Sequence, residues 1–198
     1  MTYDVLIALA TFALVTSATP GPNNLMLMAS GANFGFRRTI PHMLGIGIGF
    51  TLMVAVVGLG LAGMFDAWPA LHTVLKGASV LYLLWLALKI ANASAPAGAG
   101  VSAGGRPFTF LEAAGFQWVN PKAWAMALTA VTVYAPGREV WAVLLVAVIF
   151  GAINLPSVST WTIAGQAIRR WLTNPGRLRV FNLTMALLLV LSLVPMLV

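Results

Sequence analysis

Residues 4–33 read DVLIALATFALVTSATPGPNNLMLMASGAN, and Asp4 is the only charged side chain among them. A helix needs roughly 20 mainly apolar residues to cross a bilayer, and this stretch is longer than that. Its apolar run is interrupted near the middle by Thr-Pro-Gly-Pro-Asn-Asn, residues 19–24. The stretch therefore predicts a membrane-spanning helix that is broken at a defined point.

The rest of the chain has the same apolar character. Of 198 residues, 60% are hydrophobic and 8% are charged, whereas about 25% of the residues in a typical soluble domain are charged. So few ionisable side chains cannot cover the surface of a soluble particle of this size. The composition excludes a soluble enzyme and a disordered or collagen-like chain, and it predicts an integral membrane protein.

Six blocks are apolar and long enough to span a bilayer. They are continuously apolar, which favours helices over the alternating strands of a membrane barrel. We therefore expect an all-α integral membrane protein with six transmembrane helices in one domain, residues 1–198. A linker rich in Ala, Gly, Ser and Pro, about 92–108, separates a first unit, about 1–91, from a second, about 109–198. The blocks are roughly 4–33, 41–64, 69–90, 109–134, 139–165 and 177–198.

Basic residues are concentrated on one side of the predicted membrane. Arg138 is alone in the connections on the opposite side. Because cytoplasmic loops carry the excess of positive charge, we expect the N-terminus and the C-terminus to lie outside. The same bias accounts for the net charge of +7 without a nucleic-acid partner. The residues on the predicted cytoplasmic side are Arg37, Arg38, Lys89, Arg106, Arg169, Arg170, Arg177 and Arg179.

The two halves of the chain follow the same plan. Pro22 in the first predicted span and Pro121 in the fourth stand 99 residues apart, which is half the chain. Three spans reverse the direction of the chain, so the second unit must be inverted relative to the first. We expect two inverted three-helix repeats with broken first and fourth helices.

The first break contains two prolines. Pro20 and Pro22 lack backbone N–H groups and clash with preceding carbonyls, and Gly21 between them permits almost any dihedral angle. Asn23 and Asn24 can accept hydrogen bonds from the helix that resumes, as N-cap residues do. Irregular backbone at membrane depth is tolerated where it is buried in protein or lines a wet cavity. The break therefore predicts a cavity. The alternatives are an ordinary proline kink and an interfacial turn before a cytoplasmic amphipathic helix.

The matching break is in the fourth predicted span, at WVNPKAW, residues 118–124. Proline disfavours the α conformation for the residue before it, here Asn120. Lys122 lies near the middle of its span, where a lysine costs about 2.5–3.5 kcal/mol on insertion scales and is by default a functional candidate. The alternative is a structural cation that binds the carbonyls freed by Pro121.

Paired broken helices in two inverted halves are typical of a transporter's substrate site. Helix N-termini favour anionic groups, and freed carbonyls suit an ammonium group, so a zwitterionic amino acid fits; an acidic metabolite fits Lys122 almost as well. Gln117 and Asn154 are candidates for the same cavity. The predicted substrate-binding residues are Pro20, Gly21, Pro22, Asn23, Asn24, Gln117, Asn120, Pro121, Lys122 and Asn154.

Enzyme chemistry has little support in this sequence. It contains no phosphate-binding G-x-x-x-x-G-K-[ST] loop, no G-x-S-x-G elbow and no H-E-x-x-H pair, and it has four acidic residues and no cysteine. His42 and His72 lie near predicted interfaces without metal-ligand spacing. We expect no catalytic residue, cofactor or metal, and transport driven by an ion gradient. Within transport, the alternative to export of an amino acid is efflux of another small amphiphile or an acidic metabolite. Outside transport, the alternatives are a structural membrane subunit and an intramembrane enzyme.

The same residues carry a resemblance to a known family. The stretch ATPGPNNLMLMASGANFGFRRTIPHMLGIGIGF (18–50) resembles the N-terminal signature of the LysE/RhtB amino-acid exporters. The block FQWVNPKAWAMAL (116–128) is similar to the second signature of that family, with its asparagine–proline–lysine core. Residues 76–90 and 177–193 resemble its third and last spans. Within the family, the short loops and the NNLML variant look closest to the cysteine/O-acetylserine exporter branch.

The resemblance implies a six-helix secondary exporter of the bacterial inner membrane. The outer side, where the basic residues predict both termini, is then the periplasm. Such a protein removes amino acids or their derivatives using the proton-motive force. The implied partners are a small amino-acid substrate, protons and membrane lipid, and the sequence leaves a homo-oligomer open. An acidic residue often found near the start of the chain in this family has only Asp4 as its counterpart.

Overall fold

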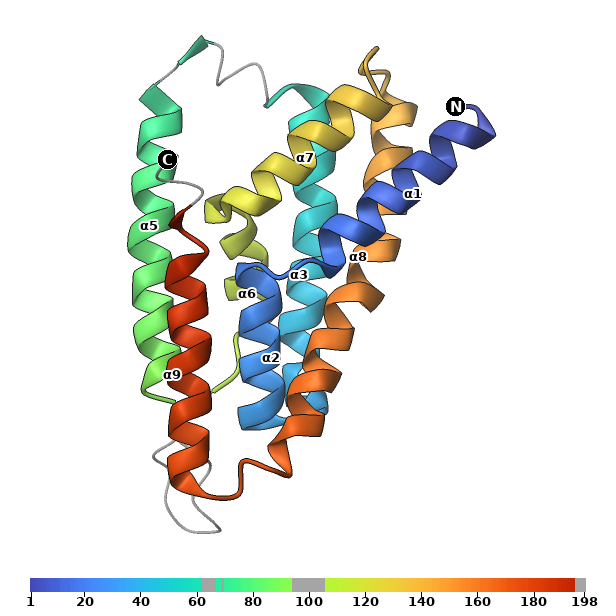
Figure 1. Cartoon of the computed structure of the whole chain (residues 1–198). Helices are drawn as coiled ribbons and strands as arrows, with labels where there is room; N and C mark the ends of the chain where they lie inside the picture. The colour runs from blue at the N-terminus through green and yellow to red at the C-terminus, as the bar shows by residue number, and fades with distance from the viewer. Residues whose placement is uncertain (62–66, 69, 94–105, 195–198) are drawn as a thin grey trace.

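The computed structural model describes residues 1–61, 67–68, 70–93 and 106–194. In these ranges all regular elements are helices, which form a tall bundle (Figure 1). Asp66 and most of the predicted linker, residues 94–105, lie outside the described residues. The elements are α1 (Tyr3–Ala18), α2 (Pro22–Phe34), α3 (Phe36–Val56), the π-helical turn η1 (Val57–Leu61), α5 (Ala70–Ala91), α6 (Phe110–Phe116), the 3-10 turn η2 (Gln117–Val119), α7 (Pro121–Tyr134), α8 (Val140–Arg169) and α9 (Pro175–Leu191).

Several of these helices are suited to a bilayer. Phe36–Gly60, Thr73–Ala91 and Val140–Arg169 are long and apolar enough to cross it, and α1 with α2, which meet at 54°, make a fourth if the pair is one span. Elsewhere in the described chain, the fourth apolar block is divided at Asn120, and α9 has 17 residues. The all-helical membrane fold is confirmed, whereas six spans and inverted repeats remain a prediction.

The first break lies where the prolines place it. α2 begins at Pro22, where the missing N–H would have no intrahelical partner in any case. Gly21 is extended, with φ −172° and ψ 178°, a conformation that any residue adopts. Space explains the glycine instead, because a Cβ here would lie 2.7 Å from Cδ of Lys122. The expected conformational freedom of Gly21 is therefore not what the break uses.

The second break also has the predicted local form. Asn120 is extended, with φ −94° and ψ 107°, as the following proline requires. Its side-chain oxygen accepts a hydrogen bond from the backbone N–H of Lys122 at 3.1 Å. Asn120 is thus both the C-cap of η2 and the N-cap of α7. Pro121 follows at the first position of α7, where a backbone N–H would have no partner within the helix.

The two breaks lie at the boundary between two parts of the core. An upper cluster joins α1, α3, α7 and α8 around Phe50 and Phe150. A lower cluster joins α2, α3, α5, α6, α8 and α9 around Leu27 and Phe116. In Figure 1, α1 and α7 slant away above the breaks, while α2 and α6 lie below them. Each broken helix therefore contributes one half to each cluster.

Glycine contacts hold α2 close to α8. A Cβ on Gly31 would lie 2.2 Å from the carbonyl oxygen of Thr162, and one on Gly165 would lie 2.1 Å from the carbonyl oxygen of Met28. Backbone therefore contacts backbone along this pair, as small residues allow between membrane helices. The contact fixes the lower half of the broken helix against the longest helix of the bundle.

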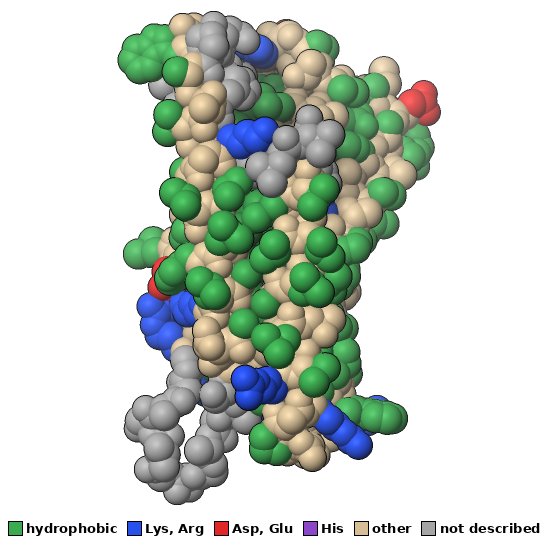
Figure 2. Space-filling model, turned by 60° about the vertical axis from the view of Figure 1, so that its left-hand side comes forward, with side chains coloured by type: hydrophobic (Ala, Val, Ile, Leu, Met, Phe, Trp, Pro, Cys, Tyr) green, Lys and Arg blue, Asp and Glu red, His purple; other side chains and the backbone are tan. Residues whose placement is uncertain are grey.

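Charged and hydrophobic side chains separate on the face that Figure 2 shows, as expected for a protein in a bilayer. Figure 2 shows one face on which hydrophobic side chains cover the middle, with Lys and Arg mainly towards the ends. α3 and α9 begin, and α5 and α8 end, at the lower end of the bundle in Figure 1. That lower end carries most residues of the predicted cytoplasmic set: Arg37, Arg38, Lys89, Arg169, Arg177 and Arg179.

Candidate functional site

Side chains from each break bind the other break. The Lys122 ammonium donates to the carbonyl oxygen of Thr19 at 2.7 Å and to its hydroxyl at 2.8 Å, across 103 residues of sequence. Asn23 donates from Nδ2 to Oε1 of Gln117 at 2.8 Å, and Gln117 donates from Nε2 back to Oδ1 of Asn23 at 3.2 Å. The two breaks predicted from the sequence therefore form one junction, defined here as residues 16–24 and 117–123.

Side chains satisfy the carbonyls at the end of α1. Asn24 donates from Nδ2 to the carbonyls of Ser17 and Thr19, each at 2.8 Å, and the hydroxyl of Thr19 donates to the carbonyl of Thr16 at 2.9 Å. The predicted N-cap role of Asn23 and Asn24 is therefore wrong. Asn24 donates back to α1, Asn23 pairs with a distant amide, and α2 begins at a glycine N-cap without a side-chain cap.

The junction also has a positive character. α2 and α7 both begin there and extend away from it, downward and upward in Figure 1. The first N–H groups of a helix have no acceptor within the helix, and they give its N-terminus a partial positive charge. Lys122 adds a full positive charge between the two helix ends. The electrostatics of the junction therefore suit a carboxylate group.

A cavity of about 20 Å³ lies at the junction. A buried water needs about 10–15 Å³ measured in this way, so the cavity admits a water molecule but no amino acid. Of the predicted site residues, the structure brings six to its wall: Gly21, Asn23, Asn24, Asn120, Lys122 and Asn154. The other four, Pro20, Pro22, Gln117 and Pro121, shape the backbone or pair beside it without lining it.

Asn154 presents an unused acceptor to this cavity. The residue is 4% exposed, and its Nδ2 donates to the hydroxyl of Ser17 at 2.9 Å. Its Oδ1 has no hydrogen bond to any described residue. Leaving such an atom unpaired costs about 1–3 kcal/mol, and an ammonium donor that reached Oδ1 when the breaks separate would remove that cost. Ser17 and Thr19 were not predicted as site residues, although Thr19 is the first residue of the first break and Ser17 lies two residues before it.

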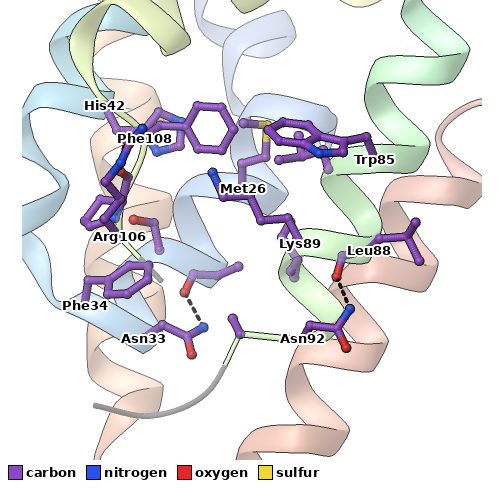
Figure 3. Close-up of a pocket in the computed structure, with 16 residues that line it drawn as sticks. Met26, Asn33, Phe34, His42, Trp85, Leu88, Lys89, Asn92, Arg106 and Phe108 are labelled. Carbon is purple, nitrogen blue, oxygen red and sulfur yellow. Dashed lines mark hydrogen bonds between the residues drawn. The ribbon is translucent and has the colours of Figure 1, made fainter. Parts of the chain in front are cut away.

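A second and larger cavity, of about 420 Å³, lies near the lower end of the bundle (Figure 3). α2, α3 and α5 contribute to its wall together with residues 106–108. Lys89 and Arg106, which the sequence marked only as indicators of topology, both line it. The volume is within the range of small-molecule sites, about 300–1,000 Å³. This cavity was not predicted from the sequence.

Known proteins match this chain over most of its length. A family model described as LysE type translocator matches residues 14–194. The chain is 33% identical over 196 residues to proteins named cysteine/O-acetylserine efflux protein from Salmonella typhimurium (strain LT2) and Escherichia coli (strain K12), covering 96% of this chain and 96% of each relative. Among solved structures, none gives a significant match.

Proposed function

Because this chain belongs to the LysE type translocator family, we propose that it is a secondary-active exporter of small amino acids or their derivatives. Membership of the family makes it a multi-pass membrane transporter and not an enzyme. Its relatives are named for efflux of cysteine and O-acetylserine, and we infer the same class of small, neutral, zwitterionic substrate here. The observation that carries the proposal is the junction of the two breaks through Lys122 and Thr19.

The junction offers complementary groups to both ends of a zwitterion. The ammonium of Lys122 and the N-termini of α2 and α7 favour the substrate carboxylate. The carbonyl of Thr19 and the free Oδ1 of Asn154 are acceptors for the substrate ammonium. These groups lie within one small cavity or beside it, so the two charges of an amino acid, a few ångströms apart, can be bound together.

The small volume of the cavity implies that binding requires the breaks to separate. In the described conformation, Lys122 and Thr19 already form the kind of contact that a substrate would make with each of them. We infer that the substrate replaces this internal contact, its carboxylate taking the Lys122 ammonium and its ammonium taking the Thr19 carbonyl. The contact between Lys122 and Thr19 would then be replaced by two contacts with the substrate, one to each residue. This replacement would link substrate binding to movement of α1 relative to α7.

The energy source we propose is the proton-motive force. The sequence has no phosphate-binding loop for ATP, and the family resemblance implies protons. Among the described acidic residues, Glu112 forms a two-point contact with Arg106 at 2.6 and 2.7 Å. That pairing holds Glu112 in its charged form, so we do not assign it as the proton carrier.

Counterflow in proteoliposomes tests the proposed function. Vesicles loaded with unlabelled O-acetylserine should accumulate external labelled O-acetylserine transiently, and an imposed pH gradient should change the net flux. Cysteine should compete, whereas dicarboxylic acids should not, because the junction has acceptors for an ammonium group. Protein-free vesicles are the control. Exchange of acidic metabolites without exchange of amino acids would replace our proposal with an anion carrier.

We propose that the lower end of the bundle faces the cytoplasm and that both termini are periplasmic. Support comes from the basic residues gathered at the lower end and from the excess of positive charge in cytoplasmic loops. Reporter domains inserted between Ala93 and Arg106 should be active in the cytoplasm, and those fused after Val198 should be active outside. A cytoplasmic C-terminus would mean an odd number of spans and would contradict the inverted repeats.

A further inference from the structure

The larger cavity is separate from the junction. Its walls share no residue with those of the junction cavity. The two are nevertheless connected along one face of α2, because Met26, Ser30 and Asn33 line the larger cavity and Asn23, which lines the junction cavity, lies one turn before Met26. A ligand in the larger cavity would therefore lie directly below the junction.

Lys89 gives this cavity a positive charge that aromatic rings contact but that has no hydrogen-bond acceptor among the described residues. Its ammonium lies 4.6 Å from the ring centre of Phe108 and 5.1 Å from that of Trp85, within the range of cation–π contact. No carboxylate or other hydrogen-bond acceptor among the described residues binds it. Arg106, the other cation in the wall, is occupied by Glu112. Figure 3 shows Lys89 extending from α5 across the cavity towards Phe108.

His42 gives the cavity an unsatisfied polar group. The side chain is 1% exposed, and its ring lies 5.2 Å from that of Phe108. Neither ring nitrogen has a hydrogen bond to any residue that the structure describes. Buried polar atoms are almost always paired with protein or water, so two unpaired nitrogens beside this cavity indicate a missing partner. Neither nitrogen is accessible to solvent in this structure, so a ligand reaches His42 only when the packing of Phe108 against it opens. In Figure 3, His42 and Lys89 approach Phe108 from opposite sides of the cavity.

We propose that this cavity is a second binding site, which takes small polar carboxylates before they reach the junction. The ligand carboxylate binds the ammonium of Lys89, and a hydroxyl, thiol or ester group of the ligand hydrogen-bonds His42. Trp85 and Phe108 enclose the apolar part of the ligand. That the ligand is the exported amino acid rests on the proposed function. That the site recognises a carboxylate rests on Lys89 alone and does not depend on the proposed function. On the predicted cytoplasmic side, such a site captures substrate for export.

Because the chain contains no cysteine, a single introduced cysteine is the only thiol that a reagent can modify. Asn92 is exposed, lines the cavity and lies three residues after Lys89. In Asn92→Cys protein in nanodiscs of zwitterionic lipid, O-acetylserine should slow modification by an uncharged methanethiosulfonate reagent. Its carboxamide analogue, which lacks the carboxylate, should not. The measured quantity is the ligand concentration that halves the modification rate.

Two lysine variants isolate the charge. Adding Lys89→Gln should raise the half-protecting concentration of O-acetylserine by about 10-fold or more, as loss of a charge-assisted hydrogen bond predicts. The matched control, Lys76→Gln, removes a lysine from an exposed position on the same helix and should leave protection unchanged. An unaltered modification rate without ligand shows that the Lys89→Gln cavity is intact. Equal protection in the two variants would overturn the proposal.

A third variant tests the assigned role of His42. Replacing His42 with Leu should keep protection by carboxylates but should remove the preference for O-acetylserine over norvaline, whose side chain is apolar. A preserved preference would exclude His42 as the polar contact. If anionic lipid slows modification and small carboxylates do not, the cavity is a lipid site and the proposal is wrong.

Counterflow in proteoliposomes, measured beside protection of Asn92→Cys, distinguishes failure of this inference from failure of the proposed function. Counterflow of O-acetylserine by the unsubstituted protein, without protection of Asn92→Cys, would reject the second site and keep the exporter. Protection without counterflow would keep a carboxylate site and reject the exporter.

Discussion

The Lys122→Met protein is expected to fold and to bind its substrate roughly 10- to 150-fold more weakly, because it loses a charge-assisted hydrogen bond of about 1.5–3 kcal/mol. Methionine keeps most of the bulk that packs on Gly21. The carbonyl of Thr19 keeps its hydrogen bond from Asn24, so the substitution leaves that buried acceptor satisfied. Substrate counterflow and thermal stability, measured on the same purified protein, provide the test.

Two further variants complete this experiment. Lys122→Arg should restore binding in part at best, since a forked guanidinium needs more room than an ammonium group and the cavity measures about 20 Å³. Lys76→Met is the matched control, because Lys76 is exposed on α5 and lies in a predicted span. A Lys122→Met protein with normal counterflow and a lower melting temperature would show that Lys122 is only structural.

The Gly165→Ala protein is expected to lose about 3 kcal/mol of stability, the upper part of the range for overpacked positions, about 1–3 kcal/mol. The added Cβ would meet the carbonyl oxygen of Met28 at 2.1 Å and the amide nitrogen of Ala32 at 3.0 Å. Both atoms belong to the backbone of α2, so only a shift of the whole helix relieves the clash. Because α2 begins at the junction, we also expect a loss of transport.

Gly77→Ala is the control for that substitution. Gly77 is also inside a helix, but a Cβ there would meet nothing within 4 Å, and alanine is favoured over glycine in helices by about 1 kcal/mol. Its melting temperature in detergent should be unchanged or higher. A Gly165→Ala protein as stable as Gly77→Ala would show that α2 and α8 are not in backbone contact.

Local features of the fold could be predicted from the sequence because their causes are local. Prolines act on their own and the preceding residues, so the ends of α1 and η2 followed from Pro20, Pro22 and Pro121. Apolar runs of spanning length identified each block that is helical in the structure. The number of spans did not follow as directly, because a block such as 109–134 is divided into pieces shorter than a bilayer.

The partners at the candidate site could not be predicted, because they are set by packing between distant segments. Lys122 was expected to bind either the substrate or the carbonyls freed by Pro121, and the acceptor that it binds in this structure, the carbonyl of Thr19, lies at the other break. Asn24 was expected to accept from its own helix, yet it donates to the previous one. Neither pattern has a signature in residue spacing.

The larger cavity was missed for a similar reason. The charge of Lys89 helped to identify the predicted cytoplasmic side of the membrane. Hydropathy does not indicate which side chains surround a lysine in the last turn of a helix. His42 was placed near an interface by its position in the sequence, and only the packing of α3 against Phe108 makes it buried. The hydropathy pattern predicts how deep in the membrane a residue lies, whereas the contacts of that residue with other helices determine its role.

Side-chain donors at the end of α1 allow the first break to serve as a hinge. A backbone N–H that completes a helix fixes the direction of the next residue, whereas the amide of Asn24 and the ammonium of Lys122 reach their carbonyls through rotatable side chains. The angle between α1 and α2, 54° in this structure, can therefore change while those side chains follow the carbonyls. We expect the carbonyls of Ser17 and Thr19 to keep their hydrogen bonds from Asn24 during the movement, since an unpaired carbonyl in hydrocarbon would cost several kcal/mol.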